Sequence, residues 1–149
     1  MNMNLQFSQK EQIELKIIAV INNSKVLDFD KDRYYLQGID FSRYNLNPVL
    51  CLNHEYDKLP IGTINNLRIE NGELIGELNI YESDIESEHV QLCKTVKDML
   101  LKKVIKGISM TTRDIETYPN NYGGDDIIRC ELLEISVVTL PNNPKSLVL

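Results

Sequence analysis

Residues 127–140 read IIRCELLEISVVTL and are followed directly by Pro141. This stretch is dense in β-branched residues, which favour strands, and proline cannot donate to a sheet ladder. We therefore expect one long strand that ends at Pro141. Further back, residues 67–78 read LRIENGELIGEL, with alternating polar and apolar positions on both sides of Asn71-Gly72. Asn-Gly supplies the two positive-φ positions of a type I′ turn, so this stretch predicts a β-hairpin.

Period-two patterns recur along the rest of the chain. Residues 1–11 are polar and are expected to be frayed, and apolar residues then alternate over residues 12–21, which predicts a strand. Shorter strands are predicted at residues 34–36 and 48–52 and a longer one at 108–115, before a mobile loop at 118–124 that contains Pro119 and Gly123-Gly124.

One long helix is predicted over residues 83–106. The capping box Ser83-x-x-Glu86 opens it, and Gly107 is expected to end it as a left-handed cap. Apolar residues at spacings of three and four then form a stripe that would pack on a sheet. The stripe consists of Leu92, Cys93, Val96, Met99, Leu100 and Val104.

These elements predict a mainly β (α+β) fold, because strands dominate and no βαβαβ alternation is present. We expect a small barrel or a strongly bent sheet with the helix packed outside. The 149 residues fit one domain, 1–149, that buries roughly two-thirds of its unfolded surface in a single core.

Composition excludes several classes of function. A formal net charge of −6 argues against nucleic-acid binding, since no basic stripe is present to neutralise phosphates. No stretch reaches membrane-spanning length and the N-terminus lacks a secretion leader, so we expect a cytoplasmic protein whose partner is a polypeptide. Three cysteines, an odd number, predict buried reduced thiols and no disulfide framework.

Two residues could form a nucleophile and its base. His54 follows the apolar strand 48–52, where a strand end delivers its side chain to a loop, although an isolated histidine is more often a surface residue. Ser109 lies at the start of the strand 108–115, with Ser109 and Thr111 on one face and Ile108 and Met110 on the other. The alternative is an ordinary strand serine.

Glu134 is the candidate acid. It stands in an apolar strand, where an unpaired carboxylate would cost several kcal/mol, so we expect it to have a partner. That partner is either a histidine whose tautomer it would hold, or a structural Arg129 or Arg113. Glu131, expected on the opposite face of the strand, is the reserve candidate. Together Ser109, His54 and an acid would supply what serine hydrolysis requires.

Other chemistries are weaker. Cys51, His54 and Cys130 lack paired-ligand spacing, so no metal is expected, nor any other cofactor. Cys51 as a nucleophile would arise from a buried strand, which suppresses thiol reactivity. His89, between acidic residues of the predicted helix, is expected to be a solvated surface residue.

Three blocks of the sequence together resemble the phage prohead maturation protease family. They are PVLCLNHE (48–55) with PIGTI (60–64), then KGISM (106–110), then RCELLEISVVTLPNNP (129–144). The order and rough spacing of the blocks also match, and the resemblance runs from about residue 26 to the C-terminus. The last block, of the form Leu-x-Glu-x-Ser-Val-Val-Thr-x-Pro, is the most specific.

The resemblance implies a serine endopeptidase with the seven-stranded barrel of herpesvirus capsid proteases. Ser109 would be the nucleophile, His54 the general base and Glu134 the orienting acid. Such enzymes cut scaffold protein, or a scaffolding-like segment of the major capsid protein, inside the immature phage shell in the bacterial cytoplasm. The chain shows no long acidic extension, which favours a separate scaffold or a capsid-protein segment as substrate. The resemblance also suggests a homodimer like that of the herpesvirus capsid proteases.

Two other functions compete with this interpretation. The first is a non-catalytic head-assembly protein that keeps the fold and binds capsid protein without cutting it. The second is a metal-dependent binding module that uses Cys51, His54 and Cys130. The presence of Ser109, His54 and Glu134 together in one chain disfavours the first, and the second ranks far lower.

Overall fold

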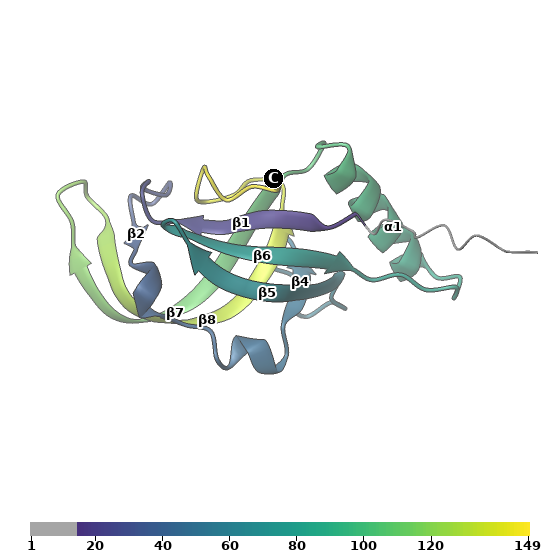
Figure 1. The fold of residues 1–149 in the computed structure, drawn as a ribbon, viewed down its shortest axis with the longest axis horizontal. Coiled ribbons are helices and arrows are strands. Elements are labelled where there is room, and N and C mark those ends of the chain that lie inside the picture. Colours follow the sequence, from purple (N-terminus) through teal and green to yellow (C-terminus); the bar gives the residue numbers. More distant parts are fainter. Residues whose placement is uncertain (1–14) are drawn as a thin grey trace, which may run out of the picture.

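The computed structural model describes residues 15–149 and is mainly β (Figure 1). The expectations for residues 1–11, and for the first part of the strand 12–21, fall outside the described residues. Within them the strands are β1 (Ile17–Asn23), β2 (Arg33–Tyr34), β3 (Ile39–Asp40), β4 (Val49–Leu52), β5 (Gly62–Glu70), β6 (Glu73–Ile80), β7 (Gly107–Pro119) and β8 (Asp125–Val138). One α-helix, α1 (Glu88–Leu101), and two 3₁₀ turns, Leu36–Gly38 and Tyr44–Leu46, complete residues 15–149.

The strands form one nearly closed, barrel-like sheet in the order β1-β6-β5-β4-β8, with β7 along the opposite edge of β8. The short β2 and β3 pair parallel with the first half of β8. Residues 146–149 bridge the remaining gap between β1 and β7: Val20 N–H donates to Leu147 O at 3.0 Å and Ile108 N–H to Ser146 O at 2.9 Å. A mainly β architecture with one helix outside the sheet is thus confirmed.

The core lies inside this curved sheet, where alternate residues of each strand point inward. Ile17, Ala19 and Ile21 of β1 are all buried, as their spacing predicts. Leu50 of β4 and Ile135 of β8 are fully buried and sit side by side in parallel register. The parallel pairing of β4 with β8 brings the end of β4 to the end of β8.

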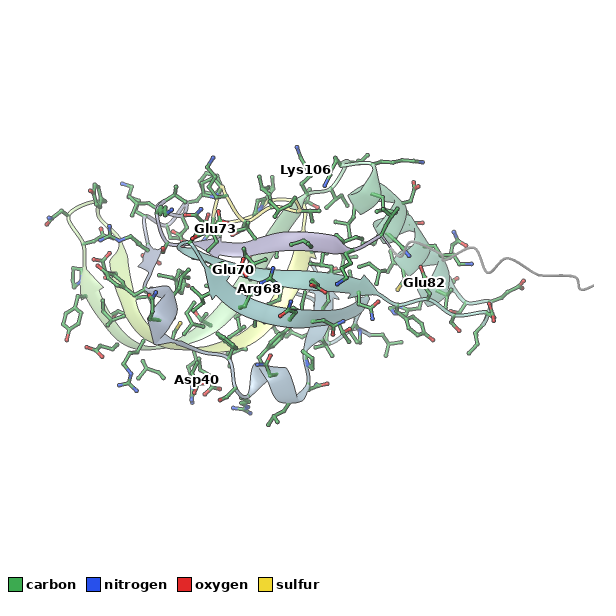
Figure 2. The ribbon with its side chains drawn as sticks, in the orientation of Figure 1. Asp40, Arg68, Glu70, Glu73, Glu82 and Lys106 are labelled. Atoms are coloured by element: carbon green, nitrogen blue, oxygen red, sulfur yellow. The ribbon has the colours of Figure 1, made fainter. Side chains whose placement is uncertain are left out.

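The predicted hairpin is present as β5 and β6. Asn71 and Gly72 both have positive φ, 51° and 77°, as a type I′ turn requires. Figure 2 shows Arg68 and Glu70 beside each other on β5, where Arg68 Nε donates to Glu70 Oε1 at 2.7 Å. These two side chains lie on one face because they are two residues apart in a strand.

Helix α1 begins later than predicted. The capping residue is Ser87, whose Oγ accepts a hydrogen bond from Val90 N–H at 3.0 Å, whereas Ser83 Oγ accepts one from Ile85 N–H in a separate turn. An N-cap of this kind contributes about 1 kcal/mol. The predicted start at Ser83 is therefore wrong, because a second serine four residues later caps the helix although it lacks the capping-box glutamate.

The end of α1 also differs from the prediction. Lys103, not Gly107, is the left-handed residue, with φ 59°. Lys103 N–H donates to Leu100 O and Val104 N–H to Met99 O, which together satisfy the last carbonyls of the helix. Gly107 instead opens β7, where a Cβ would lie 2.5 Å from Val138 O. This glycine is needed for close approach of two strands.

The apolar stripe of the helix is shifted accordingly. The buried residues of α1 are Val90, Cys93, Val96 and Leu100, whereas Leu92 and Val104 are exposed.

The loop predicted at residues 118–124 is shorter than expected. β7 and β8 form a long antiparallel hairpin whose pairing runs out to Pro119 and Asp125, which leaves only residues 120–124 in the turn.

Candidate functional site

His54 sits in a turn immediately after β4. Asn53 and His54 have φ of 50° and 59°, and Glu55 N–H donates to Leu52 O at 3.1 Å. A left-handed backbone costs an ordinary residue about 1–2 kcal/mol, so neighbouring contacts must hold it. One comes from β8 and one from the residue after it: Asn53 N–H donates to Val137 O at 2.8 Å, and Thr139 N–H donates to Asn53 Oδ1 at 3.1 Å.

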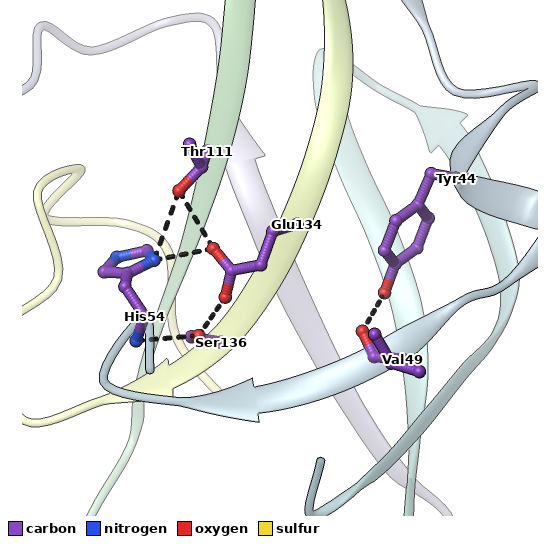
Figure 3. A network of polar contacts seen from close by, with 6 residues as sticks. All are labelled: Tyr44, Val49, His54, Thr111, Glu134 and Ser136. Atoms are coloured by element: carbon purple, nitrogen blue, oxygen red, sulfur yellow. Dashed lines mark hydrogen bonds and ion pairs between the residues drawn. The ribbon is translucent and has the colours of Figure 1, made fainter. Parts of the chain in front are cut away.

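The turn brings the His54 imidazole onto Glu134. His54 Nδ1 lies 2.7 Å from Glu134 Oε2, and the side chains are 35% and 7% exposed respectively (Figure 3). A carboxylate on Nδ1 selects the tautomer with the proton on Nδ1, which leaves Nε2 as the basic nitrogen. Of the partners considered for Glu134, the structure contains the histidine and not Arg129 or Arg113.

A β-bulge turns Glu134 toward this site. Thr111 pairs with Glu134 but Thr112 pairs with Leu132, so Leu133 is an extra residue in β8. The bulge reverses the alternation, since Cys130 and Leu132 before it and Ile135 after it all belong to the core. Strict alternation, by which Glu131 and Glu134 were expected on opposite faces, therefore does not apply.

Glu131 and Glu134 both point away from the core, but to different partners. Glu131 binds Arg43 at 3.2 Å and Arg113 at 2.9 Å, on the surface. Its carboxylate is thereby engaged by two guanidinium groups, whereas Glu134 contacts the imidazole. Glu131, the reserve acid, is not part of this cluster.

Two hydroxyl groups complete the network around Glu134. Thr111 Oγ1 donates to Glu134 Oε2 at 2.9 Å and lies 3.2 Å from His54 Nδ1. Ser136 Oγ donates to Glu134 Oε1 and accepts a hydrogen bond from His54 N–H at 3.0 Å. Sequence reasoning placed Thr111 on the face of Ser109 but missed Ser136, whose only signal was its spacing of two residues from Glu134.

Ser109 lies on β7, next to this network. It pairs with Ser136 across the strands, two residues from the Thr111–Glu134 pair. Directly paired side chains on one face have Cβ atoms about 4.5–5.5 Å apart. Ile108 is fully buried and Met110 packs against the core, so Ser109 and Thr111 share the outer face, as predicted. Within residues 15–149, no hydrogen bond joins Ser109 Oγ to His54.

Cys51 is poorly suited to act as a nucleophile in this position. It is only 3% exposed, and burial, followed by the charge of Glu134, raises the pKa of its thiol. A raised pKa keeps the thiol protonated and unreactive at neutral pH. All three cysteines are free and buried, as expected from their number.

A metal site at Cys51, His54 and Cys130 receives no support from the geometry. In the part of the chain that the structure describes, the one group with ligand-like spacing is Asp28, Asp30 and Asp32. Two of these carboxylates already accept hydrogen bonds from the protein. Asp28 Oδ1 accepts from two backbone N–H groups, and Asn142 Nδ2 donates to Asp28 and Asp30.

His89 is not the solvated residue that was expected. Its Nε2 lies 2.9 Å from Pro60 O and 3.6 Å from Cys93 Sγ, and the ring is half-buried beside Tyr81. The contact with Pro60 ties the first turn of α1 to the loop between β4 and β5. His89 is therefore a structural histidine, and His54 is the one at the polar cluster.

Comparisons with known proteins add no relative: no family model, no curated protein and no solved structure matches this chain. Among residues 15–149, no helix is both long and apolar enough to cross a membrane.

Proposed function

We propose that this protein is a serine endopeptidase in which Ser109 is the nucleophile, His54 the general base and Glu134 the acid that orients the base. The observation that carries the proposal is the 2.7 Å contact between His54 Nδ1 and Glu134, on the face of β7 and β8 that Ser109 shares. Nucleophile, base and orienter on one rigid face of a sheet are the elements of acyl transfer.

The proposed chemistry begins with proton transfer from Ser109 Oγ to His54 Nε2. The serine oxygen attacks a peptide carbonyl, and the protonated imidazole then gives its proton to the leaving amine. A water molecule then hydrolyses the resulting ester: His54 takes a proton from the water, the water oxygen attacks the ester carbonyl, and His54 returns the proton to Ser109 Oγ. Glu134 stabilises the imidazolium throughout and holds the Nδ1 proton in place. The absence of a hydrogen bond between Ser109 and His54 within residues 15–149 is compatible with this scheme, since catalytic hydrogen bonds often tighten only in the complex.

The substrate and setting follow from the likeness of residues 48–64, 106–110 and 129–144 to phage prohead proteases. We propose cleavage of scaffold protein, or of a scaffolding-like segment of the major capsid protein, inside the assembling phage head in the bacterial cytoplasm. The barrel-like sheet is compatible with a herpesvirus-protease type of fold. A homodimer belongs to the same proposal.

The test is to replace Ser109 by Ala and to follow processing of a co-expressed capsid or scaffold protein by mass spectrometry. We expect Ser109→Ala to abolish processing and labelling by a fluorophosphonate probe. Ser42→Ala is the matched control, because this serine is exposed and its Oγ donates to Asp40 Oδ1 at 2.6 Å. Equal labelling of wild type and Ser109→Ala would refute the assignment of the nucleophile.

The competing function is a non-catalytic head-assembly protein that binds capsid protein without cutting it. The lack of a hydrogen bond between Ser109 and His54 within residues 15–149 is the observation in its favour. It predicts that the wild-type protein binds capsid protein, leaves it intact and does not react with the fluorophosphonate. The same experiment therefore separates the two functions.

A further inference from the structure

Ser136 is a buried hydroxyl group at the centre of the polar cluster. It is 0% exposed and lies on β8 two residues after Glu134, opposite Ser109 in the strand register. Its Oγ accepts the His54 N–H at 3.0 Å and donates its own proton to Glu134 Oε1 (Figure 3). One oxygen atom thus connects the backbone of the base to the carboxylate that orients it.

We infer that Ser136 is a positioning residue that fixes His54 and Glu134 relative to each other, an inference that rests on the proposed function for its catalytic consequence. The Ser136 hydroxyl holds the carboxylate so that Oε1 faces Ser136 and Oε2 faces Nδ1 and Thr111. The same hydroxyl accepts the N–H of His54, whose φ of 59° is uncommon for residues other than glycine.

Only a hydroxyl group can fill both roles at this position. The amide N–H of His54 needs an acceptor, and the carboxylate of Glu134 needs a donor. Alanine at position 136 would leave both groups without their partner at a position that is 0% exposed. The left-handed turn would then lose one of its contacts with β8, and the carboxylate would be free to rotate away from Nδ1.

Ser136 is not itself the nucleophile. Its oxygen is completely buried, so a peptide carbonyl cannot reach it, and its proton is committed to Glu134. Ser109, its partner across the strands, is partly exposed and makes no such bond within residues 15–149. The two paired serines therefore have different roles, with Ser109 facing substrate and Ser136 facing the base.

The test compares Ser136→Ala with Ser146→Ala by ¹⁵N NMR of the imidazole side chains. Ser146 is a matched control, since it is 1% exposed and its Oγ donates to Ile21 O at 2.7 Å. The chain has only two histidines, so His89 serves as an internal reference. We expect the wild type and Ser146→Ala to show His54 with its proton on Nδ1, and Ser136→Ala to show a mixture of tautomers.

Kinetics supply the second measurement. Ser136→Ala should lower kcat by about 10–10³-fold with KM changed less than threefold, because Ser136 touches the base and not the substrate. Ser146→Ala should leave both within twofold. If Ser136→Ala does not fold, Ser136→Cys makes the same comparison, since a thiol keeps the shape but is a weak donor and acceptor.

A wild-type imidazole spectrum in a folded position-136 variant would overturn the inference, as would an unchanged kcat. Failure of the proposed function looks different. In that case the wild type neither cleaves capsid protein nor reacts with the fluorophosphonate, while the tautomer change in Ser136→Ala still supports Ser136 as the link between His54 and Glu134.

Discussion

The turns at Asn53-His54 and Asn71-Gly72 each have two consecutive residues with positive φ, but the second residue is histidine in one and glycine in the other. Their φ values are 50° and 59° in the first turn, and 51° and 77° in the second. Glycine adopts such angles readily, whereas histidine is held there against a cost of about 1–2 kcal/mol. The hairpin turn thus has glycine at its second positive-φ position, where glycine is unstrained, whereas the turn after β4 has histidine at the equivalent position.

The contacts of the two turns explain this difference. Gly72 O accepts hydrogen bonds from Ser24 N–H and Ser24 Oγ, and this turn only connects two strands. At the other turn, His54 N–H is bound by Ser136 and its imidazole by Glu134. Unfavourable backbone is often concentrated at functional sites, and here it carries the side chain that contacts Glu134.

The largest expected difference between the two turns is in the proposed enzymatic activity, which depends on His54 in the turn after β4. If the proposed function holds, we expect His54→Ala to lower kcat/KM by about 10⁴-fold or more, because the proposed general base is lost. Cleavage of a peptide that spans a mapped processing site measures it. His89→Ala, which removes a structural contact with Pro60 O, should retain activity within about tenfold if circular dichroism shows it folded. Equal losses in both variants would remove the distinction between the two histidines.

The next effect is on stability at the hairpin turn. Gly72→Ala should lower the free energy of unfolding by about 1–2 kcal/mol, since alanine is strained at a φ of 77°. Urea denaturation measures this change, and the rate of peptide cleavage by the Gly72→Ala variant should equal that of the wild type. Asn71→Gly at the neighbouring position is the control and should change stability by only about 0.5 kcal/mol. A Gly72→Ala protein as stable as wild type would show that this turn tolerates an ordinary residue.

The smallest effect separates the two asparagines. Asn53→Ala and Asn71→Ala both replace a residue that tolerates left-handed backbone. Of the two, only Asn53 has an Oδ1 that accepts a hydrogen bond within residues 15–149, from Thr139 N–H at 3.1 Å. We expect Asn53→Ala to be the less stable variant by roughly 0.5–1 kcal/mol in urea denaturation. Equal stabilities would mean that this contact does not hold the His54 turn.

The regular parts of the sheet could be predicted because their signals are local. Alternation of polar and apolar residues marks β5 and β6, and Asn71-Gly72 carries its own turn geometry. The exact first and last residues of α1 could not be predicted. Ser83 and Ser87 are both suitable caps, and packing of Val90 and Cys93 in the core favours the later start.

The site was predicted in part. The expectation that Glu134 needs a partner rests on the cost of burying a carboxylate, and His54 was one of the candidates for that partner. Ser136 could not be recognised, because a serine in a strand has no distinct pattern and its role depends on a turn 82 residues earlier in the chain. The bulge at Leu133 was also hidden, since apolar residues occupy both faces around it.

The amino-acid sequence by itself determined a β-rich chain with one helix, the Asn71-Gly72 hairpin, and the identity of Ser109, His54 and Glu134 as candidates. Local propensity and hydrophobic periodicity are enough for these, because they depend on neighbours within a few residues. Only the tertiary structure decided that His54 meets Glu134 through a left-handed turn, with Thr111 and Ser136 beside them. Such contacts arise from strand register and a bulge, which are set by packing of the whole sheet.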